Sequence, residues 1–106
     1  MSANVKKLLA ELKQGLIKIY GERLKKLYLY GSYARGDQRE GSDLDVLVVL
    51  NDFERAPIEL DRTDDLIGEL SLEYLITISP IFMRENDWLT ADKPLFRNVR
   101  VEGVPV

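Results

Sequence analysis

Apolar side chains recur every three or four positions through the first twenty residues and then change to alternation. The helical spacing over residues 4–20 predicts an amphipathic helix that packs on a sheet, and Gly21 is expected to end it. Residues 24–30 end in alternating leucine and tyrosine, which predicts a strand with its leucines on one face and its tyrosines on the other. The nearly continuous apolar run at residues 43–50 predicts a second strand buried on both faces.

The second half of the chain continues the succession of helices and strands. Pro57 suits the first turn of a helix, and Pro80 is expected to close a strand. The predicted elements are a short helix over residues 32–37, a helix over 56–72, a strand over 73–79 that 81–83 can extend, a helical turn over 85–89 with Trp88 beneath it, and a terminal helix over 94–101. This order predicts an α/β (α+β) fold, with a small mixed sheet of three to four strands and helices packed on one face, in a single domain of residues 1–106.

The composition restricts the classes of function. The 106 residues are 45% hydrophobic, which suffices for one modest core. A net charge of -3 and a pI near 5.0 argue against a broad basic surface for nucleic acid. Without cysteine or histidine the chain has no disulfides, no thiolate or histidine zinc sites and no Ser-His hydrolysis. No apolar segment reaches the roughly 18 residues of a membrane span and no signal-peptide core follows the start, so we expect a cytoplasmic protein with no membrane partner.

Two carboxylates stand at the start of the second predicted strand. Side chains two apart in a strand share a face at roughly 6.6 Å, so Asp43 and Asp45 can reach toward one point. An unpaired carboxylate on a buried strand loses hydration, and a divalent cation is the simplest compensation. Taken singly, Gly31 and Gly36 are ordinary turn residues and Ser32 an ordinary helix N-cap. Their combination with two acids within one short stretch favours a metal-assisted phosphate site.

The small and acidic residues between the first two predicted strands form one ordered motif, made of Gly31, Ser32, Ala34, Gly36, Ser42, Asp43 and Asp45. This motif resembles the signature of the DNA polymerase beta-type nucleotidyltransferase superfamily. The small size narrows the resemblance to the minimal nucleotidyltransferases (MNT), single-domain proteins often encoded beside a small helical HEPN partner. The resemblance implies a polymerase beta-like fold and nucleotidyl transfer, while leaving the acceptor open because such enzymes use different acceptors.

The motif residues have the chemistry that nucleotidyl transfer needs. Asp43 and Asp45 are the predicted catalytic residues and the predicted ligands of two Mg²⁺ ions, since hard cations prefer carboxylate and phosphate oxygens. Gly31 permits close approach of the backbone to ATP or another nucleoside triphosphate, and the Ser32 hydroxyl and the following amides form a nest for phosphates. Mg²⁺ cannot be distinguished from Mn²⁺ here. The predicted nucleotide-binding residues are Gly31, Ser32, Arg35 and Ser42.

A third carboxylate is implied by the resemblance and is not evident. The family normally places it on the strand after the second helix, which corresponds to a position near Thr77. This chain has threonine there, and Glu73 is the only acid nearby. An exposed glutamate at a helix end is the more ordinary role for Glu73. The departure bears on turnover rather than on nucleotide and metal binding.

Two hypotheses of different classes follow. In the first, the protein moves a nucleoside monophosphate, AMP from ATP, onto a hydroxyl of a partner protein, as the antitoxin of a HEPN/MNT toxin-antitoxin pair that modifies a tyrosine of the HEPN toxin. In the second, it is a catalytically weak or inactive binding module that neutralises the same toxin by forming a complex. Transfer to an RNA end is a third reading, disfavoured by the acidic balance. A homo-oligomer is left open, since three apolar residues of the tail suit a core or a contact surface: Phe96, Val99 and Val101.

Overall fold

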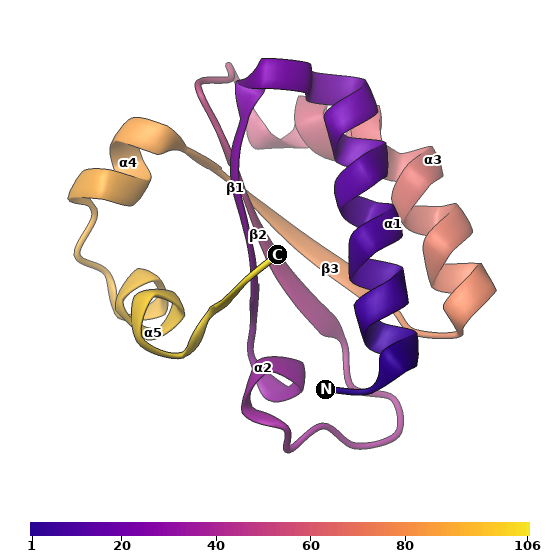
Figure 1. The fold of residues 1–106 in the computed structure, drawn as a ribbon. Helices are drawn as coiled ribbons and strands as arrows, with labels where there is room; N and C mark the ends of the chain where they lie inside the picture. The colour runs from indigo at the N-terminus through magenta and orange to yellow at the C-terminus, as the bar shows by residue number, and fades with distance from the viewer.

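A four-stranded sheet separates two layers of helices in the computed structural model, which describes residues 1–106 (Figure 1). The helices are α1 (Ala3–Tyr20), the 3-10 turn η1 (Gly21–Arg23), α2 (Ser32–Arg35), α3 (Ala56–Tyr74), α4 (Glu85–Thr90) and α5 (Pro94–Glu102). The strands are β1 (Leu24–Tyr30), β2 (Leu44–Leu50), β3 (Ile78–Arg84) and β4 (Val104–Pro105), in the sheet order β3-β2-β1-β4. β1 runs antiparallel to β2 and β4, whereas β2 and β3 run parallel. The predicted class, a small mixed sheet with helices, is confirmed.

The two long helices, α1 and α3, cover one face of the sheet (Figure 1). The Ser2 hydroxyl caps α1 by accepting a hydrogen bond from the amide of Val5 (3.1 Å), and Gly21 ends the helix with a φ of +56°. None of the helices is both long and apolar enough to cross a membrane. The leucines of β1 point to this face, as their alternation predicts, and the core here includes Leu8, Leu12, Leu16, Leu27, Leu29, Val46, Val48 and Leu70.

The two short helices, α4 and α5, form a second layer on the opposite face of the sheet (Figure 1). Trp88 of α4 and Val99 of α5 are buried against Leu47 of β2. The rings of Tyr28 and Trp88 lie 5.1 Å apart, so the tyrosine face of β1 is the one that this layer covers. The predicted helical turn over Trp88 and the predicted terminal helix are both confirmed, and their position shows that helices also cover the second face.

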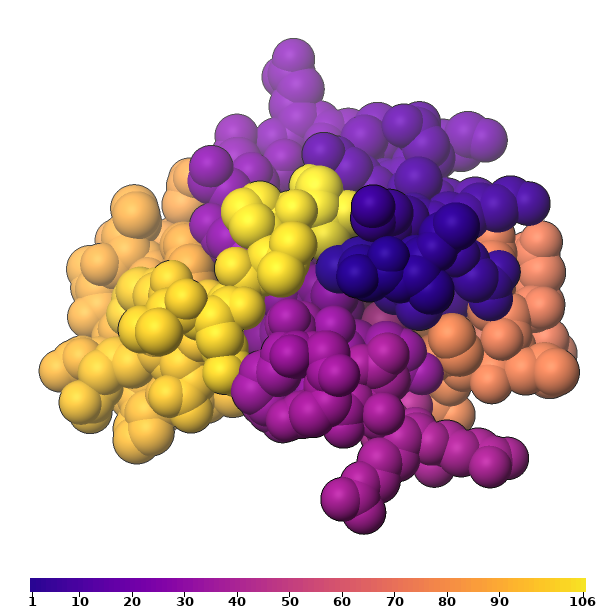
Figure 2. All heavy atoms as spheres, turned by 60° about the horizontal axis from the view of Figure 1, so that its bottom comes forward, coloured from indigo at the N-terminus to yellow at the C-terminus, as the bar shows by residue number.

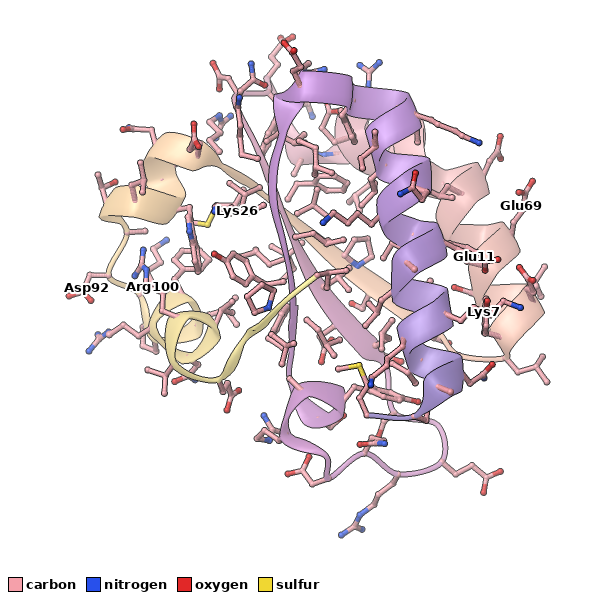
Figure 3. All side chains as sticks on the ribbon, in the orientation of Figure 1. Lys7, Glu11, Lys26, Glu69, Asp92 and Arg100 are labelled. Atoms are coloured by element: carbon pink, nitrogen blue, oxygen red, sulfur yellow. The ribbon has the colours of Figure 1, made fainter.

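Arg100 joins α5 to α4 (Figure 3). Its guanidinium lies 4.7 Å from the centre of the Trp88 ring and donates hydrogen bonds to the carbonyls of Trp88 and of Ala91, the latter at 2.8 Å. Because α5 is attached in this way, one side of the helix is buried against the sheet and the other side is exposed. Val99 is buried, whereas Val101 is 89% exposed on the outer side of α5.

The third strand begins later than its alternation predicts. Residues 73–79 were the predicted strand, but α3 continues through Tyr74, whose hydroxyl donates a hydrogen bond to Glu11 of α1 (2.5 Å). Leu75 then ends the helix in left-handed backbone with a φ of +54°. β3 runs through Pro80, because an edge strand needs no amide on its open side. The predicted start of this strand and its predicted close at Pro80 are therefore wrong, and its predicted extension over residues 81–83 is confirmed.

A buried carboxylate links α1 to α3 at the end of the sheet away from α2. Glu59 is only 3% exposed and accepts hydrogen bonds from the Tyr20 hydroxyl (2.8 Å) and from Nε of Arg62 (3.1 Å). Burial, followed by the hydrogen bond to Glu59, raises the pKa of the Tyr20 hydroxyl, so this group keeps the proton that it donates. The buried carboxylate thus accepts hydrogen bonds from both α1 and α3.

Tyr20→Phe should lower the free energy of unfolding by about 1–3 kcal/mol, because a buried charge loses one of its two donors. Tyr74→Phe removes a similar bond to Glu11 from a solvent-accessible site and should cost clearly less. Urea unfolding followed by circular dichroism compares the two variants. Equal losses would contradict the dependence on burial.

Candidate active site

Two carboxylates lie close together at the start of β2. Asp45 is the second residue of β2 and is half-buried, while Asp43 directly precedes the strand and is exposed. Burial and then the charge of Asp43 raise the pKa of the Asp45 carboxyl, while the Arg35 guanidinium lowers it. The predicted pairing of the two acids is therefore present. Two like charges facing a shared space are a donor set that suits a hard divalent cation.

Gly31 brings the turn after β1 into direct contact with Asp45. Its φ is +75°, and a Cβ atom built on it would lie 2.3 Å from Oδ2 of Asp45. Only glycine accepts both the left-handed backbone and this approach. The carbonyl of Gly31 accepts hydrogen bonds from the amides of Ala34 and Arg35, both at 3.1 Å, so the amides of Ser32 and Tyr33 precede the first bonded amide of α2.

Arg35 ties α2 to the C-terminal layer. Its Nε lies 3.1 Å from a carboxylate oxygen of Asp37, and its Nη1 lies 3.2 Å from one of Glu102. The hydrogen bond to Asp37 raises the pKa of the Arg35 side chain, which is nearly half-exposed. The predicted phosphate ligand thus lies beside the carboxylate pair, and two acids hold it in place.

Ser42 shapes the loop that leads into β2. Its hydroxyl accepts a hydrogen bond from the amide of Arg39 (2.9 Å), and its own amide donates to the carbonyl of Arg39 (3.0 Å). These bonds close a tight turn directly before Asp43. The structure brings Ser42 next to the pair, with its hydroxyl engaged as an acceptor.

Two residues that the sequence analysis did not select stand on either side of Asp45. The strand register pairs Asp45 with Tyr30 on β1 and with Ser79 on β3. Burial and then the charge of Asp45 raise the pKa of the Tyr30 hydroxyl to about 12. The alternation of β1 could have indicated Tyr30. Ser79 could not be found, because its neighbour on β2 follows only from the register of two strands distant in the sequence.

The expected third carboxylate is absent. Thr77 precedes β3, and its carbonyl accepts a hydrogen bond from the amide of Leu44 (2.8 Å). Glu73 lies in the last turn of α3 and borders a hollow between α3 and α1 with Lys7 and Glu11, on the other face of the sheet from Asp45 (Figure 3). It is a helix-end glutamate. No three acidic, histidine or cysteine side chains gather to hold a metal ion.

The carboxylate pair lies on an open surface. Figure 2 views the end of the molecule that carries α2, where the purple and magenta residues that follow β1 lie below the adjoining indigo N-terminus and yellow C-terminal segment. None of the hollows in the molecule is lined by Asp43 or Asp45. A hollow of about 350 Å³ lined by Phe53, Phe82 and Arg84 lies at the opposite ends of β2 and β3.

Comparison with known proteins identifies the family. A family model described as a nucleotidyltransferase domain matches residues 6–100, which include the turn at Gly31 and both aspartates. The chain belongs to the nucleotidyltransferase domain family. The predicted superfamily and the predicted enzyme class are thereby confirmed, and the carboxylate pair of this nucleotidyltransferase is its candidate active site.

Similar proteins agree with this membership. A protein of Methanocaldococcus jannaschii named as a protein adenylyltransferase is 35% identical over 106 residues, which cover 94% of this chain and 95% of that protein. A solved minimal nucleotidyltransferase has a TM-score of 0.61 and 23% identity, covering 95% of this chain and 94% of its own. A structure of tri-AMPylated Shewanella oneidensis HEPN toxin in complex with MNT antitoxin matches with a TM-score of 0.53 and 18% identity, covering 92% of this chain and 70% of that chain.

Gly31→Ala and Gly36→Ala separate the cost of the backbone from the contact with Asp45. Both glycines have positive φ, but the space around Gly36 is open. Each variant should lose about 1–2 kcal/mol of unfolding free energy, because alanine is strained in left-handed backbone. Only Gly31→Ala should displace the Asp45 side chain. Urea unfolding and the carboxyl ¹³C shift of Asp45 measure the two effects, and an unchanged Asp45 signal in Gly31→Ala would contradict the close contact.

Proposed function

We propose that this nucleotidyltransferase transfers AMP from ATP onto a hydroxyl group of a partner protein. The observation that carries the proposal is the pair Asp43 and Asp45, which face one open space beside the turn at Gly31. An open site suits an acceptor that is itself a protein, because a small acceptor would need an enclosing pocket to exclude water. The name of the Methanocaldococcus relative, a protein adenylyltransferase, supports the same acceptor class.

The reaction forms a bond between the acceptor oxygen and the α-phosphorus of ATP and breaks the bond from that phosphorus to the bridging oxygen of pyrophosphate. Asp43 and Asp45 would hold Mg²⁺, with two ions expected, and Mg²⁺ supplies the positive charge that neutralises the phosphate oxygens. The remaining predicted contacts to the triphosphate are the amides after Gly31, the Ser32 hydroxyl, and the side chains of Arg35 and Ser42.

The proposed context is a toxin-antitoxin pair in the cytoplasm. The partner would be a HEPN-domain protein, and the acceptor a tyrosine hydroxyl on it. Support comes from the structural neighbour in which an MNT antitoxin is in complex with an AMPylated HEPN toxin. Asp43 is exposed, and none of the hollows in the molecule is lined by Asp43, Asp45 or Arg35, so a protein partner could approach them from solvent.

A second function is favoured by one specific observation. No third acidic side chain gathers with Asp43 and Asp45 to hold a metal ion, so the fold could act as a binding module that neutralises the HEPN protein by complex formation alone. In that case nucleotide would be bound weakly or would not be bound.

Asp43→Asn and Asp45→Asn should each reduce AMP transfer by about a hundredfold or more, since the cation contributes several kcal/mol of charge stabilisation and each tenfold in rate is about 1.4 kcal/mol. The assay incubates the protein with α-³²P-labelled ATP, Mg²⁺ and the product of the neighbouring gene as the candidate partner. Asp64→Asn, at an exposed position of α3, is the matched control and should retain transfer. If both site variants neutralise the toxin as well as the wild type does, the binding-module function is the correct one.

Chelation of divalent cations with EDTA should stop labelling of the partner and leave the complex intact in gel filtration, because the cation binds the phosphates rather than the protein interface. Added Mg²⁺ should restore labelling. Transfer that persists after chelation would show that the carboxylates act without a metal.

A further inference from the structure

Three strands place one side chain each in a row beside the carboxylate pair. Asp45 is registered opposite Tyr30 on β1 and opposite Ser79 on β3. Registered partners on neighbouring strands point to the same face, and their backbones lie about 4.8 Å apart. Ile81 and Met83, which follow Ser79 on its face of β3, pack with the α4 and α5 layer. The Ser79 hydroxyl therefore projects from the face that carries Asp45.

A hydroxyl at this position shares one property with a carboxylate and differs from it in two others. It offers an oxygen that can ligate a hard cation, as the serine or threonine of phosphate-binding loops does for Mg²⁺. It adds no negative charge, and it cannot take a proton from an acceptor near neutral pH. Thr77, two residues before Ser79 and just ahead of β3, also bears only a hydroxyl. Asp37 and Glu102, the further acids that lie near the pair, both form ion pairs with Arg35.

We propose that the Ser79 hydroxyl is the third protein oxygen for the cation held by Asp43 and Asp45, and that no side chain of this protein acts as base toward the acceptor. The inference rests on the proposed function in that a divalent cation binds at the pair. Because the protein offers the cation only two carboxylates, the triphosphate oxygens must supply the remaining ligands. Cation and nucleotide therefore bind together. The acceptor proton then passes to water or to a basic group of the acceptor protein.

The test measures the affinity for Mn²⁺ by electron paramagnetic resonance, with and without a non-hydrolysable ATP analogue. The variants are Ser79→Asp, Ser79→Ala and Ser79→Asn. Gln38→Asp is the matched control, because it adds the same charge in the exposed loop between α2 and β2. Ser79→Asn keeps an oxygen at this position without adding a negative charge that would repel Asp43 and Asp45. It replaces Ser79→Asp in the test if the aspartate variant does not fold.

Ser79→Asp should bind Mn²⁺ alone about tenfold or more tightly than the wild type, because a third charge joins the pair. Ser79→Ala should weaken Mn²⁺ binding in the presence of the analogue by about tenfold, and Ser79→Asn should stay within about threefold of the wild type. Gln38→Asp should change neither affinity by more than about twofold, since exposed charges are screened.

The inference is overturned if Ser79→Asp binds Mn²⁺ no more tightly than Gln38→Asp, or if Ser79→Ala binds the Mn²⁺–analogue pair as the wild type does. Failure of the proposed function looks different. A wild type that binds Mn²⁺ with the analogue but labels no partner refutes the transfer and leaves the role of Ser79 intact. A wild type that labels its partner while every Ser79 variant binds Mn²⁺ equally well refutes only the role of Ser79.

Discussion

The repulsion between two carboxylates held on one face of a central strand is the constraint around which this end of the molecule is built. Asp45 cannot turn away freely, because β2 is paired on both sides and the backbone of Gly31 occupies the space next to its carboxylate. Asp43 stands one pleat further out on the same side. A cation between the two charges, as proposed above, would relieve this repulsion, so the fold would prepare the binding site before the ligand arrives.

The rigidity of β2 makes that preparation possible. Leu44, Val46 and Val48 are buried beneath α1 and α3, and Leu47 and Val49 are buried beneath α4 and α5, so the strand is clamped between two layers. The Arg35–Glu102 ion pair joins α2, at the start of the motif, to α5. An exposed ion pair contributes little to stability. Its effect here is to fix where the Arg35 guanidinium, a proposed phosphate ligand, stands relative to Asp45.

Local patterns in the sequence predicted most of the helices and strands and identified every residue of the motif. The bounds of α1, β1 and α5 follow from periodicity, and the shared face of the two aspartates follows from their spacing. Two features could not be predicted. The end of α3 is marked by Leu75 rather than glycine, so its left-handed backbone has no local signal. The row of Tyr30, Asp45 and Ser79 depends on the register of long-range strand pairs, and no local pattern fixes that register.

An open carboxylate pair has consequences for specificity. Water screens charge at a surface, so the attraction between Asp43, Asp45 and a cation strengthens only when another molecule covers the site. Val101 on α5 is exposed, as are Leu72 and Leu75 at the end of α3, and these side chains offer apolar surface to a covering molecule. In the proposed transfer to a partner protein, the docking of that partner would determine when the charges become effective. Selectivity would then reside in the fit of the partner, because none of the hollows of this domain is lined by Asp43 or Asp45.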